Sequence, residues 1–451
     1  MKVCEALKKN YPLIIIFIFT FLVYTVLGFF INNGDPTASY GFSHAIRNGE
    51  IIYRDFNTIA TPFYAFYSSI FLFIFDEFIM FIFSQTILVT IMFYFLFKLF
   101  GNKSYIVLLS MIMFKFFGFN ATYNFCCLAM SVIVLFLEEK YPNKDYLIGF
   151  VLGLVFLSKQ TVGGLFLLPS FIICFKQYKK LFKRVVGFII PCIILVIYLL
   201  LHHALYEFID LCFLGLFDFG SNNNSLFTIW FFISMILIII SVLLVIKDHK
   251  KIDYYGLMYF GFVLPIFDLP HFAYYFVGFV IMILFHVPKL NIYKYILIFG
   301  LIIEFTLFNF AMAIRVDQPI LYNVNHFKYT YNFKTDYIIG NKMSSYIDQY
   351  IEYDPILIMY YSMRYNISHD RNISYFDIFL YGNHGYNGTN KMINRIKKMK
   401  NQYFIISMEE YFDSKKNKEN GNQFNSEVVD YIISKSKKID CNKMLCVYYK
   451  E

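Results

Sequence analysis

Charged residues are scarce in this sequence. Asp, Glu, Lys and Arg make up only 16% of the 451 residues, whereas 58% are hydrophobic and 22% are aromatic. Because about a quarter of the residues of a soluble domain are charged, this composition excludes an ordinary soluble enzyme and indicates a membrane protein. Apolar segments of about 17 to 22 residues, the length that crosses a hydrocarbon core of ~30 Å, recur between Leu13 and Ala313. The sequence therefore predicts about eleven transmembrane helices.

A signal-peptide cleavage site and metal-binding cysteine spacings are also lacking. Three lysines precede an apolar run from Leu13 to Ile31. This run is too long for a signal-peptide core and no small-residue cleavage site follows it, so we expect a retained signal anchor. The eight cysteines show no metal-ligand spacing. Cys441 and Cys446 could form a disulfide if the C-terminal end faces an oxidising compartment.

The charges of the loops predict the topology. Cytoplasmic loops are rich in Lys and Arg, and basic clusters occur at 98–103, 176–184, 247–251 and 289–294. These clusters account for most of the net charge of +9 without a nucleic acid partner. With the N-terminus cytoplasmic as well, the outward loops are 32–61, 119–122, 158–161, 202–224 and 268–271. The segment 62–75 is too short to cross the membrane, so we interpret it as a juxtamembrane or re-entrant helix.

The chain turns polar after Arg315. Its patterns predict helices near 341–351, 389–399 and 426–434, and strands near 356–361, 403–407 and 445–449. The expected fold is an all-α polytopic membrane domain at 1–314, with a first external loop at 32–61, followed by a small extracytoplasmic α/β domain at 315–451.

The first outward loop contains the most informative pattern. Asp35 and Pro36 follow the first apolar segment, a short helix then ends at Gly49, the string Tyr53-Arg54-Asp55-Phe56 comes next, and Pro62 opens an aromatic helix. This pattern resembles the first external loop of the GT-C glycosyltransferases. These integral-membrane enzymes use sugars linked to lipid phosphates.

Two later outward corners extend the resemblance. Lys159 and Gln160 lie in a corner that resembles the Lys-containing corner of many bacterial members of this family. Asp268 and His271 lie in a corner that resembles a recurring Asp and His corner further along. The resemblance runs over most of the chain, including the external soluble domain.

The resemblance implies a role for each of these residues. Asp35 matches the acidic residue expected to take a proton from the acceptor hydroxyl while it attacks the anomeric carbon in an inverting hexosyl or pentosyl transfer. The leaving group is a phosphate or diphosphate on a polyprenol, and its departing charge needs a cation. The candidate residues for binding the donor phosphate or the substrate are Arg54, Asp55, Lys159, Gln160, Asp268 and His271. The active site is expected between the first loop and the two corners, open sideways to the bilayer.

Asp35 has a second interpretation. It could cap a helix that has Pro36 in its first position, which is a common pairing. The chain also departs from the family pattern here, because Pro36 stands where a second acid could follow, and Asn120 and Asn124 occur where family members often have an Asp. Because of these departures, the sequence does not decide whether a divalent metal is bound, and we assign no metal ligands.

The other candidates have structural interpretations too. Arg54 and Asp55 could simply pair with each other, and Lys159 could be an interfacial anchor, although its predicted outward side disfavours Lys. Asp268 and His271 could form a tight turn. The sequence alone does not choose between these interpretations.

Three functions remain open. The first is a glycosyltransferase that moves a sugar from a polyprenyl-phosphate carrier to a cell-envelope glycan or lipid acceptor on the outer face of a bacterial plasma membrane. The second is a transporter or flippase of a lipid-linked sugar, although the sequence lacks repeated hydropathy halves. The third is a catalytically lapsed envelope scaffold. The bacterial source is an interpretation of the bias towards Phe, Tyr, Ile, Asn and Lys, which is typical of a low-GC genome.

Overall fold

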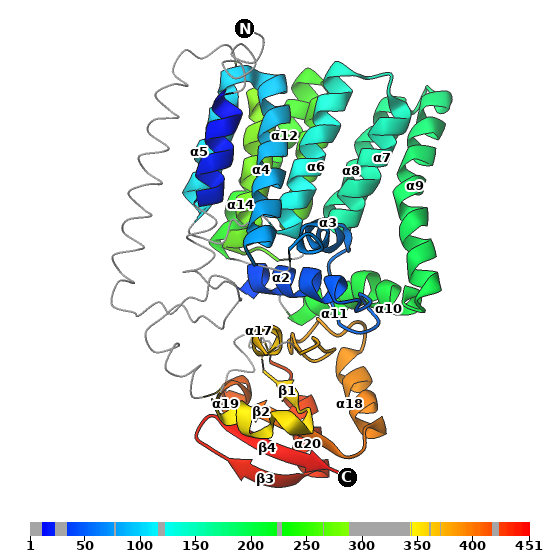
Figure 1. The fold of residues 1–451 in the computed structure, drawn as a ribbon. Helices are drawn as coiled ribbons and strands as arrows, with labels where there is room; N and C mark the ends of the chain where they lie inside the picture. Colours follow the sequence, from blue (N-terminus) through cyan, green and yellow to red (C-terminus); the bar gives the residue numbers. More distant parts are fainter. Residues whose placement is uncertain are drawn as a thin grey trace.

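Most of the chain is helical. The computed structural model describes residues 11–22, 34–75, 78–115, 122–222, 228–264, 266–287, 343, 345–359, 362–369, 371–416 and 424–451. The larger part is a bundle of helices that run up and down beside one another (Figure 1). Its helices are α4 (Phe78–Phe100), α5 (Ser104–Lys115), α6 (Tyr123–Lys140), α7 (Asp145–Ser158), α8 (Gln160–Cys174), α9 (Tyr178–Leu201), α12 (Ile229–Asp248), α13 (Lys251–Met258) and α14 (Leu269–Leu284), with a further helix at Tyr11–Leu22.

Three stretches of the described chain are long and apolar enough to cross a membrane. They are Ile79–Met111, which contains α4 and continues into α5, Tyr178–Leu201 and Ile229–Asp248. The other apolar helices have 10 to 17 residues. The expected total of about eleven crossings is therefore not shown. Residues 288–342, which contain the expected boundary at 314, lie outside the described residues.

The two ends of the bundle differ in chemistry. One end, here called the capped end, is covered by α2 (Gly34–Arg47), α3 (Phe63–Leu72), α10 (Leu205–Ile209), the π-helical turn η2 (Asp210–Leu214) and α11 (Gly215–Asn222) (Figure 1). The other, here called the basic end, has the clusters at 98–103, 176–184 and 247–251. In the view of Figure 1, α2 and α3 lie across the capped end rather than along the bundle, as expected for the segment 62–75.

Helices α7 and α9 approach each other closely. Gly149 of α7 lies against the backbone carbonyl of Arg184, and Gly187 of α9 lies against that of Tyr146. A Cβ atom at either glycine would collide with the facing backbone. Gly149 and Gly153 are four residues apart, which is the small-residue spacing that lets membrane helices touch.

Buried charges link five helices near the basic end. Arg184 of α9 pairs with Glu138 of α6 and with Asp145 of α7, and all three side chains are almost fully buried. Ser170 of α8 and Tyr255 of α13 complete the network through hydrogen bonds. Each buried charge has an opposite partner, which a low-dielectric interior requires.

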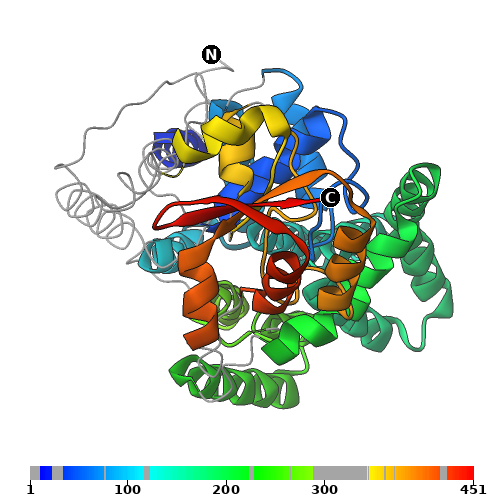
Figure 2. The same ribbon diagram turned by 90° about the horizontal axis from the view of Figure 1, so that it is seen from below.

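The C-terminal residues form a small α/β domain. Its sheet has the order β1-β2-β4-β3, with β1 parallel to β2 and the other pairs antiparallel. The strands are β1 (Ile356–Ile358), β2 (Gln402–Ser407), β3 (Lys437–Cys441) and β4 (Leu445–Lys450), and the helices are η4 (Asp348–Tyr353), α17 (Met363–Ser368), α18 (Gly388–Lys398), α19 (Met408–Lys416) and α20 (Ser426–Lys435). Cys441 and Cys446 form a disulfide between β3 and β4. Seen from below, the domain lies over the capped end (Figure 2).

Candidate functional site

The segment between α2 and α3, residues 48–62, is here called the first loop. Two of its residues have left-handed backbones and shape it. Helix α2 ends at Arg47 and is followed by Gly49, whose φ of +88° suits glycine, and the amide of Glu50 donates back to the carbonyl of Ala45 (3.0 Å). Tyr53 has φ +70° although it is a bulky residue, and it is fully buried. Its hydroxyl donates to the carbonyl of Ala60 (2.8 Å), which closes the loop. Such strain persists only where the surroundings hold the residue firmly.

Arg54 and Asp55 pair with each other. The Arg54 guanidinium donates from Nε to Asp55 Oδ1 and from Nη2 to Asp55 Oδ2, both at 2.8 Å. Burial raises the pKa of the Asp55 carboxyl, but the hydrogen bonds from Arg54 and the Ile51 amide outweigh it and lower this pKa below its ordinary value. Their mutual pairing, which was the alternative to substrate binding, accounts for both side chains. The Arg54 side chain is 46% exposed.

Lys159 lies at the break between α7 and α8. Its extended backbone (φ −155°, ψ 110°) separates the two helices, and only 5% of the residue is exposed. Its Nζ donates to Asn124 Oδ1 of α6 (2.7 Å) and lies 5.4 Å from the centre of the Phe262 ring. An interfacial anchor would reach into the headgroup region, so the burial of this ammonium argues against that interpretation.

Gln160 holds the neighbouring segments together. Its Nε2 donates to the carbonyl of Ile59 in the first loop and to that of Cys212 in η2, both at 2.9 Å. Thr61 adds a second link, because its hydroxyl donates to the carbonyl of Phe156 (3.1 Å). The first loop is therefore bonded directly to the corner of Lys159.

Asp268 and His271 form an ordered pair before and within the first turn of α14. Asp268 Oδ1 accepts from the His271 amide (2.9 Å) and lies 2.7 Å from His271 Nδ1. Burial raises the pKa of Asp268, but these hydrogen bonds, together with the charge of Lys159, lower it overall. Asp268 thus caps α14, where the structural interpretation was a tight turn, and its side chain also orients the imidazole of His271.

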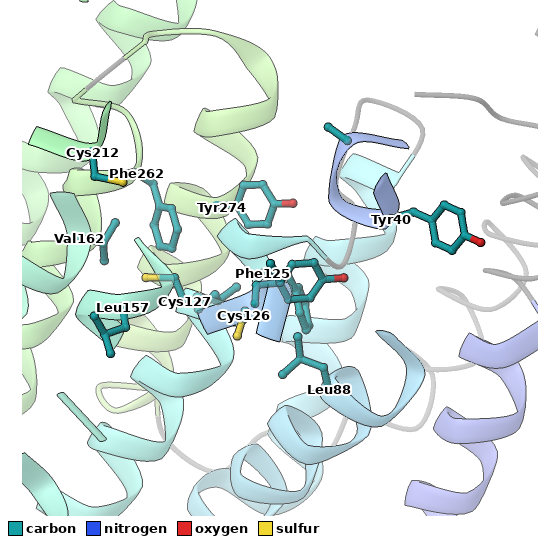
Figure 3. Close-up of a cluster of buried hydrophobic side chains, with 14 of the residues drawn as sticks. Tyr40, Leu88, Phe125, Cys126, Cys127, Leu157, Val162, Cys212, Phe262 and Tyr274 are labelled. Atoms are coloured by element: carbon teal, nitrogen blue, oxygen red, sulfur yellow. The ribbon is translucent and has the colours of Figure 1, made fainter. Parts of the chain in front are cut away.

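The structure thus places the first loop and both corners at the capped end, with the first loop bonded to the Lys159 corner. The apolar cluster beneath them includes Cys127, Val162 and Phe262 (Figure 3). Asp35 is the second residue of α2, and its side chain lies outside the described residues. Its catalytic role therefore remains a prediction.

Comparison with known proteins identifies no relative. No protein-family model matches the chain, and neither curated proteins nor solved structures give a significant match. The site must be interpreted from its own geometry.

Sequence reasoning missed a buried acidic pair beside this site. Glu50 follows α2 and is 8% exposed, and its Oε1 accepts from the Ile373 amide of the C-terminal domain (3.4 Å). Burial, with the charges of Asp377 and Asp55, raises the pKa of Glu50 to about 7. Asp377 is 1% exposed, and burial also raises its pKa. No periodic signal marks Glu50, because its partners are more than 300 residues away.

A second missed group docks the C-terminal domain onto η2. Lys391 of α18 pairs with both Glu207 and Asp210, and Arg395 lies 3.8 Å above the ring of Tyr375 and 3.6 Å from Glu207. Lys391 and Arg395 are four residues apart on an amphipathic helix, which predicts a charged face but not its partner. In addition, Asn57 of the first loop donates to the carbonyl of Asn383 (2.8 Å).

Among the described residues, no group of metal ligands lies at this site. Within the described ranges, the one group of three carboxylate and imidazole side chains with suitable spacing is Asp248, Asp253 and His286, at the basic end. The capped end therefore supplies no such group from the residues that the structure describes.

Proposed function

We propose that this chain is a membrane glycosyltransferase that moves a sugar from a polyprenyl-phosphate carrier to a cell-envelope acceptor on the outer face of the plasma membrane. The observation that carries the proposal is the buried ammonium of Lys159. It lies at the same end of the bundle as the oriented Asp268 and His271 pair, its charge acts on Asp268, and the neighbouring Gln160 links this corner to the first loop. A buried cation near an anionic substrate strengthens the attraction and stabilises a departing phosphate.

Each residue has a defined role in this proposal. Asp35 accepts the proton of the acceptor hydroxyl, and Lys159 offers its charge to the leaving phosphate. His271 turns Nδ1 towards Asp268, so its Nε2 is available to the phosphate or to a proton in transit. Arg54 and Asp55 shape the loop through their mutual pair rather than contact the substrate.

The arrangement of charges supports the proposed sidedness. The basic clusters gather at one end and the candidate residues at the other, as the positive-inside rule requires for an outward site. The Cys441–Cys446 disulfide agrees with a C-terminal domain in an oxidising compartment.

The test measures release of polyprenyl phosphate by purified protein in lipid. The protein is supplied with a panel of polyprenyl-phosphate sugars and envelope extract. We expect release that is abolished by Asp35→Asn and strongly reduced by Lys159→Met. The matched control is Lys98→Met, because Lys98 is exposed and lies at the basic end. No release from any donor, or full activity of Asp35→Asn, would refute the proposal.

A further inference from the structure

Three cation-binding side chains meet at the basic end of the bundle. Asp248 is the last residue of α12, Asp253 lies in the first turn of α13, and His286 follows α14. One ligand atom from each lies within 4.8 Å of the other two. Because α12 has 20 residues, its rise places this group ~30 Å from the candidate site at the other end.

Both nitrogens of the His286 ring face carboxylates. Nε2 lies 2.6 Å from Asp253 Oδ1, and Nδ1 lies 2.9 Å from Asp248 Oδ2. A histidine that binds a metal through one nitrogen commonly has its other nitrogen held by a carboxylate, which fixes the ring. An ion at one nitrogen would take the place of its hydrogen bond to a carboxylate, and a carboxylate oxygen of each aspartate lies close enough to bind the same ion.

A second observation indicates a missing partner. Asp253 is fully buried, and its Oδ2 has no hydrogen-bond partner in the described part of the chain. The other oxygen of the same carboxylate is bonded to His286, so Asp253 faces into the group. A buried carboxylate oxygen without a donor is unfavourable, and a bound cation would satisfy it.

One neighbouring cation competes for the same place. Lys250 Nζ lies 3.3 Å from His286 Nδ1 and 3.8 Å from Asp248 Oδ2. Its side chain is 49% exposed, so it can turn into solvent when an ion enters. Without an ion, ion pairs and hydrogen bonds among the same four side chains would hold the helix ends together, an arrangement here called an electrostatic clamp.

We infer that Asp248, Asp253 and His286 bind a divalent transition-metal ion. Carboxylate oxygens with an imidazole nitrogen suit Zn²⁺ or Mn²⁺ better than Ca²⁺ or Mg²⁺, which prefer oxygen ligands alone. The ion joins the ends of α12, α13 and α14. Its role is structural, and it does not depend on the proposed glycosyl transfer at the opposite end.

Zn²⁺ titration by calorimetry tests this inference. The protein carries no affinity tag and is stripped with a chelator before titration in detergent. We expect one ion for each chain, and at least about tenfold weaker binding by Asp253→Asn and by His286→Asn. His249→Asn is the matched control, because His249 is an exposed imidazole at the same end and its φ of +49° is one that Asn tolerates. Its affinity should equal that of the wild type.

Lys250→Ala separates an ion site from an electrostatic clamp. This exposed substitution removes the competing cation without touching a proposed ligand, so the ion should bind several-fold more tightly. The inference is overturned if neither the wild type nor Lys250→Ala binds Zn²⁺ saturably. It is also overturned if folded His286→Asn protein binds as tightly as the wild type.

Discussion

Glu50 should make the attachment of the C-terminal domain sensitive to pH. Its carboxyl is buried between the first loop and the Ile373 amide, and its Oε2 has no hydrogen-bond partner among the described residues. The pKa of this carboxyl is raised from 4.5 to about 7. The folded protein therefore holds this proton more tightly than the unfolded chain. Consequently, the stability contributed by Glu50 falls as the pH rises from about 4.5 to about 7, and it stays level at higher pH.

Substitution of Glu50 by Gln removes this dependence. With 1.36 kcal/mol for each pKa unit, the raised pKa of Glu50 lowers the stability by about 3 kcal/mol at pH 8, where the folded carboxyl is ionised, and by about 0.8 kcal/mol at pH 5, where it is protonated. Gln keeps the shape of the side chain and carries no charge. The Glu50→Gln variant should thus be more stable than the wild type at pH 8, and the difference should be much smaller at pH 5.

The assay is proteolysis of the detergent-solubilised protein in a urea series at several pH values. Cleavage of the C-terminal domain reports its unfolded fraction. Glu352→Gln serves as the control, because Glu352 is an exposed acid of the same domain. A Glu50→Gln variant that matches the wild type at pH 8, or that differs from it equally at every pH, would refute this reasoning.

Three further predictions concern other contacts. Lys391→Met leaves the buried Asp210 without its cation and Glu207 with Arg395 alone, so the C-terminal domain should lose about 2 to 4 kcal/mol and be cleaved more readily by protease, unlike the exposed control Lys397→Met. Arg184→Met leaves the buried Glu138 and Asp145 without their cation, so the bundle should lose about 3 to 5 kcal/mol of stability. The loss should be seen as less monodisperse protein in detergent, whereas the exposed control Lys179→Met should have no effect. Cys441 and Cys446 should react with a thiol reagent only after reduction, and labelling of the untreated protein would contradict the disulfide.

The sequence predicts elements best where a local pattern is strong. The strands at 356, 403 and 445 and the helices at 389 and 426 occur close to their expected places, because the strands are short apolar runs with consecutive buried residues and the helices are amphipathic. Strand β3 was not predicted, since it is an edge strand whose residues are mostly exposed and which begins with Lys437 and Lys438. Helices α17 and α19 were missed as well, because they are short and weakly patterned.

The candidate site was predictable only in part. The corners at Lys159 and Asp268 were noticed because polar residues interrupt apolar segments. The structure bonds the Lys159 corner to the first loop and places the Asp268 corner at the same end of the bundle. Their partners were not predictable, because the contact of Gln160 with Ile59 spans 101 positions and that of Lys391 with Asp210 spans 181. Contacts of this kind depend on tertiary packing, which no local pattern encodes.

The close approach of α7 and α9 limits where the bundle can open. Backbone atoms face each other at Gly149 and Gly187, so neither helix can slide or rotate against the other without steric collision. If the proposed lipid-linked donor enters sideways, we expect it to pass between other helices than α7 and α9. Because Lys159 directly follows α7, the close contact of α7 with α9 helps to fix its position.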